Sequence, residues 1–239
     1  MGRISMTSLI QASAKNLKKN YSISNEYSNI NNIFNEKINI SIWKRNLSSN
    51  IENAVKILLN KNSDLEFSEL LNKYNSMEIL INKFGEDEKL LCFYKDITNL
   101  IEKFCSLFNI KDSWLRIDAI DKPMCPRFHS DYVKCRLITT YLGPATQWLP
   151  NSLVNRDKLG HGNNGLPDNE SGLFSKYSDI KQMNVGDVGL LKGEAWINNE
   201  GFGLVHRSPD VIENHKRLYV TLDFDDLYRS IFNHNSNFI

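Results

Sequence analysis

The sequence predicts an α+β fold, in which helices in the first half of the chain precede an all-β barrel or sandwich in the second half. Two observations favour this class. Between residues 51 and 110, apolar residues recur every three or four positions, the spacing of an amphipathic helix. Beyond residue 112, short segments rich in β-branched and aromatic residues are separated by Gly and Pro, without helical spacing between them. We therefore expect a flexible N-terminal segment (1–45), a helical support region (46–112) and a β domain (113–239).

The composition is that of a soluble globular protein, with 41% hydrophobic and 24% charged residues. A net charge of +1 gives no indication of nucleic-acid or membrane binding. The four cysteines form no Cys-x-x-Cys pair, so neither a zinc knuckle nor a disulfide scaffold is expected. No apolar run approaches the roughly 20 residues of a membrane span.

The N-terminal segment is rich in Asn, Ser and Lys, a composition typical of a mobile or loosely attached stretch. Residues 1–24 are basic and Ser-rich but lack the apolar core of a secretory signal. A transit peptide is one interpretation, and a flexible leader is the one we prefer. We expect a cytoplasmic location by default.

The helical region ends in the most regular apolar stripe of the chain. Such a stripe needs a partner surface, for which the outer face of a sheet is suited. Its members are Leu90, Leu91, Tyr94, Ile97, Leu100, Ile101, Phe104 and Phe108.

The β domain should contain at least five short strands. The first alternates apolar and polar residues, as a half-buried strand does. The next three are short runs that end near Gly or Pro, and the last is a β-rich run. They are expected at 114–120, 134–142, 187–192, 203–206 and 217–224.

One long polar stretch, 150–184, interrupts the series of short strands and is rich in Gly and Asn. A loop of this length in a compact domain is usually functional or disordered. We interpret it as a lid or substrate loop, with a disordered insertion as the alternative.

A His-x-Asp pair, His129 and Asp131, indicates where the chemistry lies. Residues separated by one position point to the same face of a strand, so both side chains can reach one ion. His206, late on another expected strand, is the best candidate for a third ligand. Two imidazoles and one carboxylate form the facial triad of non-haem Fe(II) oxygenases, which leaves positions open for other ligands.

The spacing around His206 strengthens this weak motif. Gly186-Asp187 precedes His206 by 20 positions, which fits the turn into an antiparallel hairpin. Arg217 follows His206 by 11 positions and begins the next expected strand, where its guanidinium could grip a carboxylate bidentately.

The order His-x-Asp, Gly-Asp, His and Arg resembles that of the Fe(II)/2-oxoglutarate-dependent dioxygenase superfamily. The resemblance covers roughly residues 114–226 and implies a double-stranded β-helix (jelly-roll) barrel with supporting helices outside. It implies that His129, Asp131 and His206 bind Fe(II), and that Arg217 pairs with the distal carboxylate of 2-oxoglutarate. Tyr141 could donate a hydrogen bond to a cosubstrate carboxylate, or it could be an ordinary strand aromatic.

A more specific resemblance is to a bacterial family known only as a domain of unknown function. Several long strings agree in order with its pattern: CPRFHSD at 125–131, RLITTYLGPATQWLP at 136–150, GDVGLLKGEAW at 186–196 and LVHRSP at 204–209. The chain departs from it at Ala145, where Gly would be usual. This resemblance constrains the fold well, but it says little about the reaction, because the family has no established activity.

Four further residues are candidates for substrate binding. Arg127 lies two positions before His129, so on a strand its side chain would share the face of His129 and could point inward. By strand parity Arg136 falls on the face opposite Asp131, so an anion-binding role and an exterior salt bridge are equally open. Trp148 and Trp196 could line a pocket, although large buried aromatics are more often part of a core.

The leading hypothesis is a dioxygenase that uses Fe(II) and 2-oxoglutarate to oxidise an unknown small-molecule or peptide substrate. The alternative is a non-catalytic, cupin-like metal- or ligand-binding module, because Zn(II) or Ni(II) can occupy the same ligands. A third hypothesis is an interaction protein whose metal site has decayed. The sequence leaves the substrate and the oligomeric state open.

Overall fold

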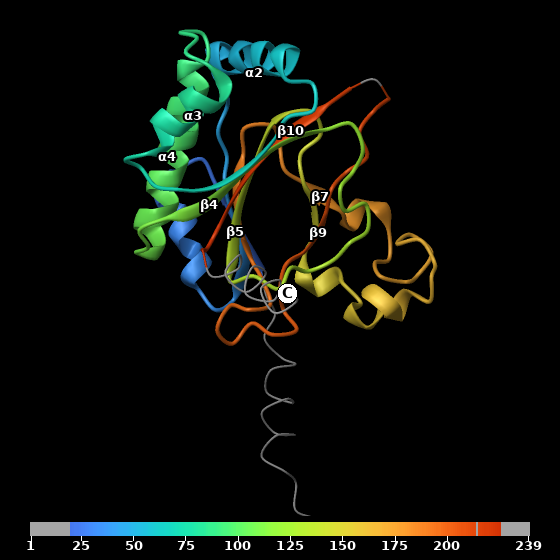
Figure 1. The fold of residues 1–239 in the computed structure, drawn as a ribbon. Helices are drawn as coiled ribbons and strands as arrows, with labels where there is room; N and C mark the ends of the chain where they lie inside the picture. Colours follow the sequence, from blue (N-terminus) through green and yellow to red (C-terminus); the bar gives the residue numbers. More distant parts are fainter. Residues whose placement is uncertain (1–19, 214, 226–239) are drawn as a thin grey trace, which may run out of the picture.

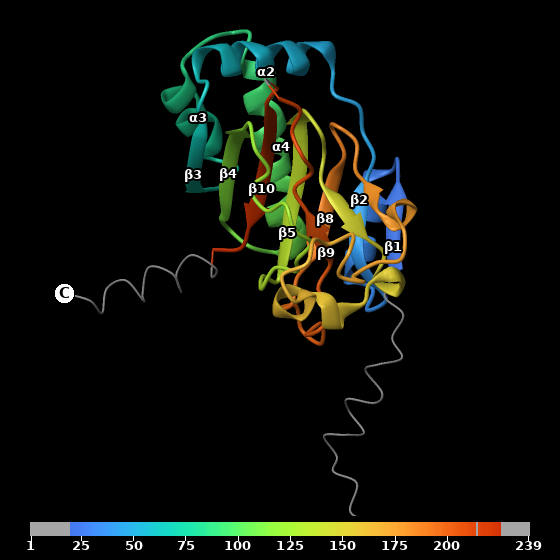
Figure 2. The ribbon, with the colours of Figure 1, turned by 90° about the vertical axis from the view of Figure 1, so that its right-hand side faces the viewer.

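The structure is a computed structural model that describes residues 20–213 and 215–225 (Figure 1). Its largest element is a seven-stranded sheet in the order β1-β2-β8-β5-β10-β4-β3. Neighbouring strands are antiparallel, except that β1 and β2 are parallel. In that order the strands are Asn20–Ser24, Ile38–Trp43, Val188–Lys192, Cys135–Leu142, Arg217–Asp223, Ser113–Ile120 and Glu66–Leu71. Figure 2 shows this order across the sheet.

A smaller sheet lies opposite the first. It contains β7 (Lys181–Gln182), β6 (Gln147–Leu149) and β9 (Val205–Arg207) in that order. An isolated antiparallel bridge between His129 and His206 adds one more segment beyond β9. Figure 1 shows the two sheets facing each other, with β4 and β5 on one side and β7 and β9 on the other.

The path of the chain identifies the barrel. From β4 it crosses to the His129 segment in the small sheet, returns to β5, crosses to β6 and β7, returns to β8, crosses to β9 and returns to β10. Four strands of the large sheet therefore face four segments of the small one. This is a double-stranded β-helix, or jelly roll. With the helices outside it, the α+β class predicted from the sequence is confirmed.

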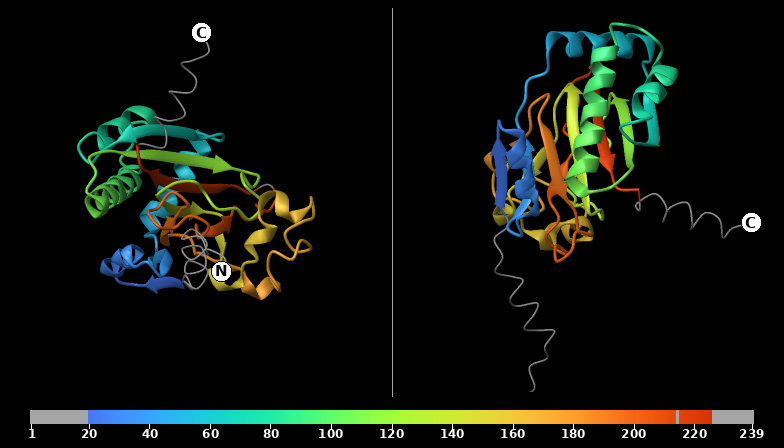
Figure 3. Two further views of the ribbon diagram at one scale, coloured as in Figure 1. Left: turned by 90° about the horizontal axis from the view of Figure 1, so that it is seen from below. Right: turned by 90° about the vertical axis from the view of Figure 1, so that its left-hand side faces the viewer.

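Three helices cover the outer face of the large sheet (Figure 3). They are α2 (Ser49–Lys61), α3 (Ser76–Phe84) and α4 (Leu91–Phe108), and a short 3-10 helix η1 (Tyr27–Phe34) lies beside them. The stripe of α4 is buried in one cluster with outward-facing sheet residues, among them Phe93 and Ile97 of the helix and Leu137 and Val220 of the sheet. The predicted partner of that stripe is therefore the sheet.

The N-terminal part differs from the flexible segment that was predicted. Residues 20–45 form β1, η1 and β2, and β2 pairs with β8. Ile40 and Ile42 point into the barrel and are buried. The Asn- and Ser-rich composition hid an alternating strand pattern, INISIW, at 38–43. Residues 1–19 of the predicted segment lie outside the described residues.

The large sheet crosses the boundary predicted at residue 112. Its strand β3 lies within the region predicted to be helical and pairs with β4.

Among the described residues, no helix combines the length and the apolar character needed to span a bilayer.

The long stretch 150–184 is ordered rather than a disordered insertion. It contains four short 3-10 helices, η2 (Asn151–Leu153), η3 (Arg156–Lys158), η4 (Gly160–Asn163) and η5 (Tyr177–Asp179). Leu173 and Phe174 of the stretch form a buried cluster with Phe128, Leu149 and Val205, which point outward from the small sheet. The stretch is therefore a cap on the outer face of that sheet.

Candidate metal centre

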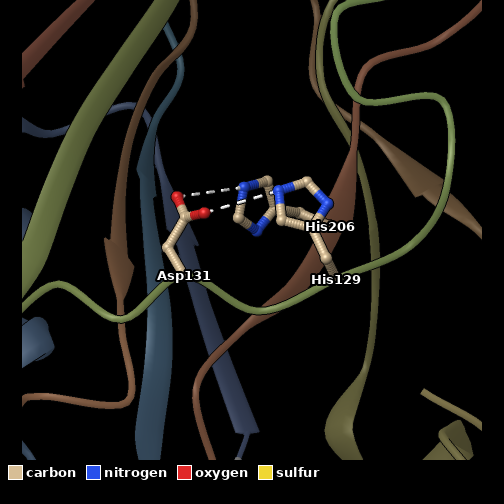
Figure 4. A group of neighbouring side chains, drawn as sticks. All are labelled: His129, Asp131 and His206. Carbon is tan, nitrogen blue, oxygen red and sulfur yellow. Dashed lines mark ion pairs between the residues drawn. The ribbon is translucent and has the colours of Figure 1, made fainter. Parts of the chain in front are cut away.

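The structure brings His129, Asp131 and His206 together between the two sheets (Figure 4). Each offers one ligand atom, and these atoms lie within 4.8 Å of one another. The Nε2 atom of His129 lies 3.4 Å from Oδ1 of Asp131, and Nε2 of His206 lies 3.6 Å from Oδ2. Two imidazole nitrogens and a carboxylate oxygen thus converge on one point, a donor set that suits a divalent transition metal.

The main chain sets the positions of the two histidines. The N–H of His129 donates to the carbonyl of His206 at 3.0 Å, and the N–H of His206 donates to that of His129 at 2.9 Å. Residues that exchange both bonds in an antiparallel pair stand directly opposite each other, with their side chains on the same face. In β9 the neighbours Val205 and Arg207 face outward, so His206 faces inward.

Asp131 lies beyond the bridge, in the segment that leads to β5. Its carbonyl oxygen accepts a hydrogen bond from the N–H of Glu194 at 2.9 Å. A Cβ atom on Gly193 would collide with the carbonyl oxygens of Val133 and Asp131. The close approach of the segment after β8 therefore requires a glycine and fixes the backbone of Asp131.

Hydrogen bonds behind the histidines turn both rings toward the carboxylate. Nδ1 of His129 lies 2.9 Å from the carbonyl oxygen of Arg127, and Nδ1 of His206 lies 3.1 Å from that of Leu204. Because a carbonyl oxygen can only accept, each bond requires the proton on Nδ1. Each Nε2 is then left with its lone pair directed at the ion position, as metal-binding histidines need.

The electrostatics of the site also favour a cation. Burial lowers the pKa of His206 to about 4, so the ring is neutral at pH 7, as a ligand must be. Burial raises the pKa of Asp131, but the proximity of His129, His206 and Arg136 lowers it more, and the net pKa is well below its ordinary value. Burial lowers the pKa of His129, but the nearby Asp131 carboxylate and the Arg127 carbonyl favour its protonated form and leave the pKa raised.

Arg136 points to the candidate centre, contrary to the face that strand parity gave it. Its Nη1 donates to Oδ2 of Asp131, and its Nε donates to Asp223 at 2.9 and 3.1 Å. The odd–even count from Asp131 failed because residues 132–134 do not belong to a strand. The alternation of inward and outward side chains in β5 therefore begins at Cys135. Asp223, which sequence reasoning did not single out, is buried beneath this arginine.

Arg217 lies at the start of β10 and is buried, at 2% exposure. Its Nη1 donates to Oγ of Ser208 at 2.6 Å and its Nη2 to Oγ1 of Thr146 at 2.9 Å. Its guanidinium stacks 4.7 Å from the ring centre of Tyr219. Its Nε is buried without a partner, and no carboxylate of the described residues forms an ion pair with it. Burial lowers the pKa of Arg217 to about 10, so it stays charged at pH 7.

Thr146 and Ser208 were not singled out from the sequence. Thr146 ends the string GPAT, two residues after Pro144. Ser208 lies directly before Pro209 in the string HRSP. Both strings are part of the resemblance to the domain of unknown function. A hydroxyl can both donate and accept, so the two side chains can share one ligand with Arg217.

Two of the candidate residues lie outside the site. Tyr141 faces the helices, because its ring packs edge-on against Phe93 and its hydroxyl donates to Asp96 of α4. Trp196 packs against Phe34 and Phe108 on the helical side of the molecule. The cosubstrate role for Tyr141 and the pocket role for Trp196 were therefore wrong, since neither side chain points into the barrel.

Trp148 and Arg127 lie nearer the centre. Trp148 is opposite His206 in the pairing of β6 with β9, and it is buried in the cluster between the sheets. Arg127 is half-exposed beside the long stretch, where it pairs with Asp168. Substrate binding by either residue, and by Arg136, stays a prediction.

Comparison with known proteins gives a family and several similar folds. The family described as "Protein of unknown function (DUF1826)" matches residues 24–223. No curated protein matches the chain in sequence. Among solved structures, the chain is similar to the dioxygenase for auxin oxidation in rice, with 10% identity and a TM-score of 0.48, over 78% of this chain and 73% of that one.

Two further solved structures are similar at the same level. The dioxygenase for auxin oxidation 1 from Arabidopsis thaliana, in its complex with 2-oxoglutarate, has 11% identity and a TM-score of 0.46, over 86% of this chain and 92% of that one. A prolyl-4-hydroxylase from Pseudomonas putida has 9% identity and a TM-score of 0.42, over 82% and 96%. The strand order given above, rather than these likenesses, defines the fold.

Proposed function

The chain belongs to the DUF1826 family, described as proteins of unknown function, and we propose from its own site that it is an Fe(II)- and 2-oxoglutarate-dependent oxygenase. One observation carries the proposal. A His-Asp-His donor set and a buried arginine without a carboxylate partner belong to the same barrel interior. The first suits a metal ion and the second suits an organic anion, and this reaction class needs both.

His129, Asp131 and His206 would hold the iron. Three protein donors would occupy only part of the coordination sphere and would leave the other positions for further ligands, as an oxygenase centre requires. When bound, the iron would couple the oxidation of a substrate C–H bond to the breakdown of 2-oxoglutarate and dioxygen. The overall reaction balances: one oxygen atom enters the substrate as a hydroxyl, the other enters succinate, and carbon dioxide leaves.

Arg217 would hold the distal carboxylate of 2-oxoglutarate. A buried charge without a partner is unfavourable, and a carboxylate bound there would remove that penalty. The hydroxyls of Thr146 and Ser208, already in contact with the guanidinium, could donate to the same anion. The chain would thereby orient the cosubstrate relative to the histidines.

The protein's own contribution would include the exclusion of water. Apolar side chains from both sheets form a buried cluster inside the barrel: Ile40, Ile42, Ile138, Ala145, Trp148, Met183, Leu191, Leu204 and Tyr219. Such surroundings strengthen the interactions of the charged groups beside them.

The test is anaerobic reconstitution of the purified protein with Fe(II), followed by addition of 2-oxoglutarate. We expect a metal-to-ligand charge-transfer band in the visible spectrum, and slow formation of succinate once air is admitted. Arg217→Met should bind the metal without the band, and His129→Ala should show neither. If the wild-type protein gives no band and no succinate, it is not a 2-oxoglutarate oxygenase.

A non-catalytic metal-binding module is the second candidate, because Zn(II) or Ni(II) suits the same donors. Arg217 favours the first candidate, since metal binding alone does not require a buried guanidinium that lacks a carboxylate partner among the described residues. Stoichiometric zinc in protein purified without added metal, together with no affinity for 2-oxoglutarate, would favour the second. The substrate, a small molecule or a peptide, stays open.

A further inference from the structure

The segment that carries His129 has little regular secondary structure to hold it. Its pairing with β9 is an isolated bridge, whereas β5 and β10 belong to ladders of several residue pairs. Beyond the two bonds between His129 and His206, one further backbone bond, from Ser208 N–H to the Cys125 carbonyl, joins the two segments. Precise placement of the ring therefore needs additional contacts.

Asp168, on the long stretch 150–184, supplies such contacts to both histidine segments. Its Oδ2 accepts a hydrogen bond from the N–H of Phe128 at 2.9 Å, one residue before His129. The same oxygen lies 3.5 Å from Nη1 of Arg207, one residue after His206. Its Oδ1 lies 3.5 Å from Nε of Arg127. A single buried carboxylate thus touches residues next to both candidate ligands.

The arginine contacts extend this link across the small sheet. The guanidinium of Arg207 stacks 4.4 Å from the ring centre of Phe128, and its Nε donates to Oε1 of Gln147 at 2.8 Å. Arg127 also donates to the carbonyl of Leu166 in the long stretch, while its own carbonyl accepts from Nδ1 of His129. Asp168 pairs with both guanidiniums, so its negative charge offsets the two positive charges beside the histidine segments.

We infer that Asp168 is a positioning residue, which holds the His129 and His206 segments in register from outside the barrel and so couples the order of the 150–184 stretch to metal affinity. This inference rests on the proposed metal site. Removing the carboxylate would leave the Phe128 N–H unpaired and the two guanidiniums uncompensated. The rings would then sample more positions, and loss of groups that orient metal ligands typically weakens binding by about 10–100-fold.

The experiment compares the wild type with Asp168→Asn, Asp168→Ala and a control in the same stretch, Asp179→Asn. Asp179 is also buried, and it accepts the N–H of Lys176 without contacting either histidine segment. The probe is Co(II) alone, titrated into metal-free protein and followed by its visible absorption. Thermal unfolding of each metal-free variant is measured in parallel.

We expect Co(II) binding to weaken by about 10-fold or more in Asp168→Ala and by less in Asp168→Asn, which keeps one oxygen for the Phe128 N–H. Asp179→Asn should lower the unfolding temperature but keep wild-type affinity. Wild-type affinity in both Asp168 variants would overturn the inference. An equal loss in Asp179→Asn would do the same, since it would show a general effect of destabilising the stretch.

A second measurement needs no metal and separates this inference from the proposed function. Amide hydrogen exchange of the metal-free protein should be faster at Phe128, His129 and His206 in Asp168→Ala, which removes the acceptor of the Phe128 N–H, and unchanged there in Asp179→Asn. If the wild type binds no Co(II), the proposed function fails, and the exchange data still decide the role of Asp168. Unchanged exchange at all three amides would refute it.

Discussion

His129 and His206 exchange both of their backbone hydrogen bonds, so the two proposed ligands stand directly opposite each other before any metal is considered. The rings also lie close, with their centres 4.7 Å apart, but the main-chain bonds do not depend on either imidazole. Loss of an imidazole should therefore remove metal binding without separating the two segments.

The first prediction concerns these ligands. His129→Ala and His206→Gln should each weaken Fe(II) or Co(II) binding by more than the roughly 100-fold that marks the upper range for supporting groups. Far-UV circular dichroism of the metal-free variants should match the wild type, because the bridge is a backbone feature. His161→Ala, in the exposed part of the long stretch, is the control and should bind normally. Unchanged binding in either ligand variant would contradict the triad.

The second prediction concerns Arg217. Replacement by Met keeps a similar length and removes a buried charge that no described carboxylate pairs with. We expect the metal-free variant to be more stable than the wild type by about 1–3 kcal/mol in urea unfolding. Metal affinity should be retained and 2-oxoglutarate affinity lost. A destabilised variant would show that the guanidinium is a structural group and not a binding group.

The third prediction concerns Tyr141, whose hydroxyl donates to Asp96 on the helical side. Tyr141→Phe should lower the unfolding free energy by about 1 kcal/mol, at the low end for a buried bond because Asp96 keeps its two bonds from Arg45. Metal and 2-oxoglutarate titrations should be unchanged. Tyr177→Phe, at an exposed position, should have no effect on stability. A weakened 2-oxoglutarate titration would restore the cosubstrate role.

The fourth prediction concerns pH. Burial lowers the pKa of His206 to about 4 in the folded protein, below the value of about 6.5 in the unfolded chain. Between these values the unfolded chain binds more protons, so folding stability falls as the pH falls from about 6.5 to 4, by up to about 3 kcal/mol from this group. His129 acts in the opposite direction: its folded pKa is raised, so it contributes stability at low pH that is lost as the pH rises through that pKa.

A comparison of variants isolates the contribution of His206. Metal-free wild type should lose more unfolding free energy between pH 7.5 and 4.5 than His206→Gln, measured by urea denaturation. Asp131, whose folded pKa is lowered, contributes stability that is lost only below about pH 4, outside this range. Equal losses in the two proteins would mean that His206 is not held neutral by burial.

The regular elements were largely predictable from the sequence. The stripe from Leu90 to Phe108 corresponds to α4, and the run 134–142 corresponds to β5 at Cys135–Leu142. Both patterns are long and periodic, so local sequence determines them. The strand β2 was missed because its apolar residues alternate with Asn and Ser, which elsewhere in the segment suggest disorder.

The site was predictable only where one local motif or one spacing fixed it. His129 and Asp131 come from one segment, and the distance along the chain to His206 and Arg217 fits successive strands of the barrel. Parity arguments failed for Tyr141 and Arg136, because an irregular segment separates them from Asp131. Asp168 was out of reach, since its partners lie about 40 positions away on either side and no periodic pattern links them.

The position of β10 has a consequence for biosynthesis. It is the last strand of the described chain, yet it lies between β5 and β4 near the middle of the large sheet, and it carries Arg217. The ribosome therefore releases this inner strand after both of its neighbours. Until then β4 and β5 have an empty place between them, and their exposed edges can pair with other chains. Stop codons or stalled translation before residue 217 should produce aggregates rather than a partly active protein, so chaperone dependence should be greatest at this late stage.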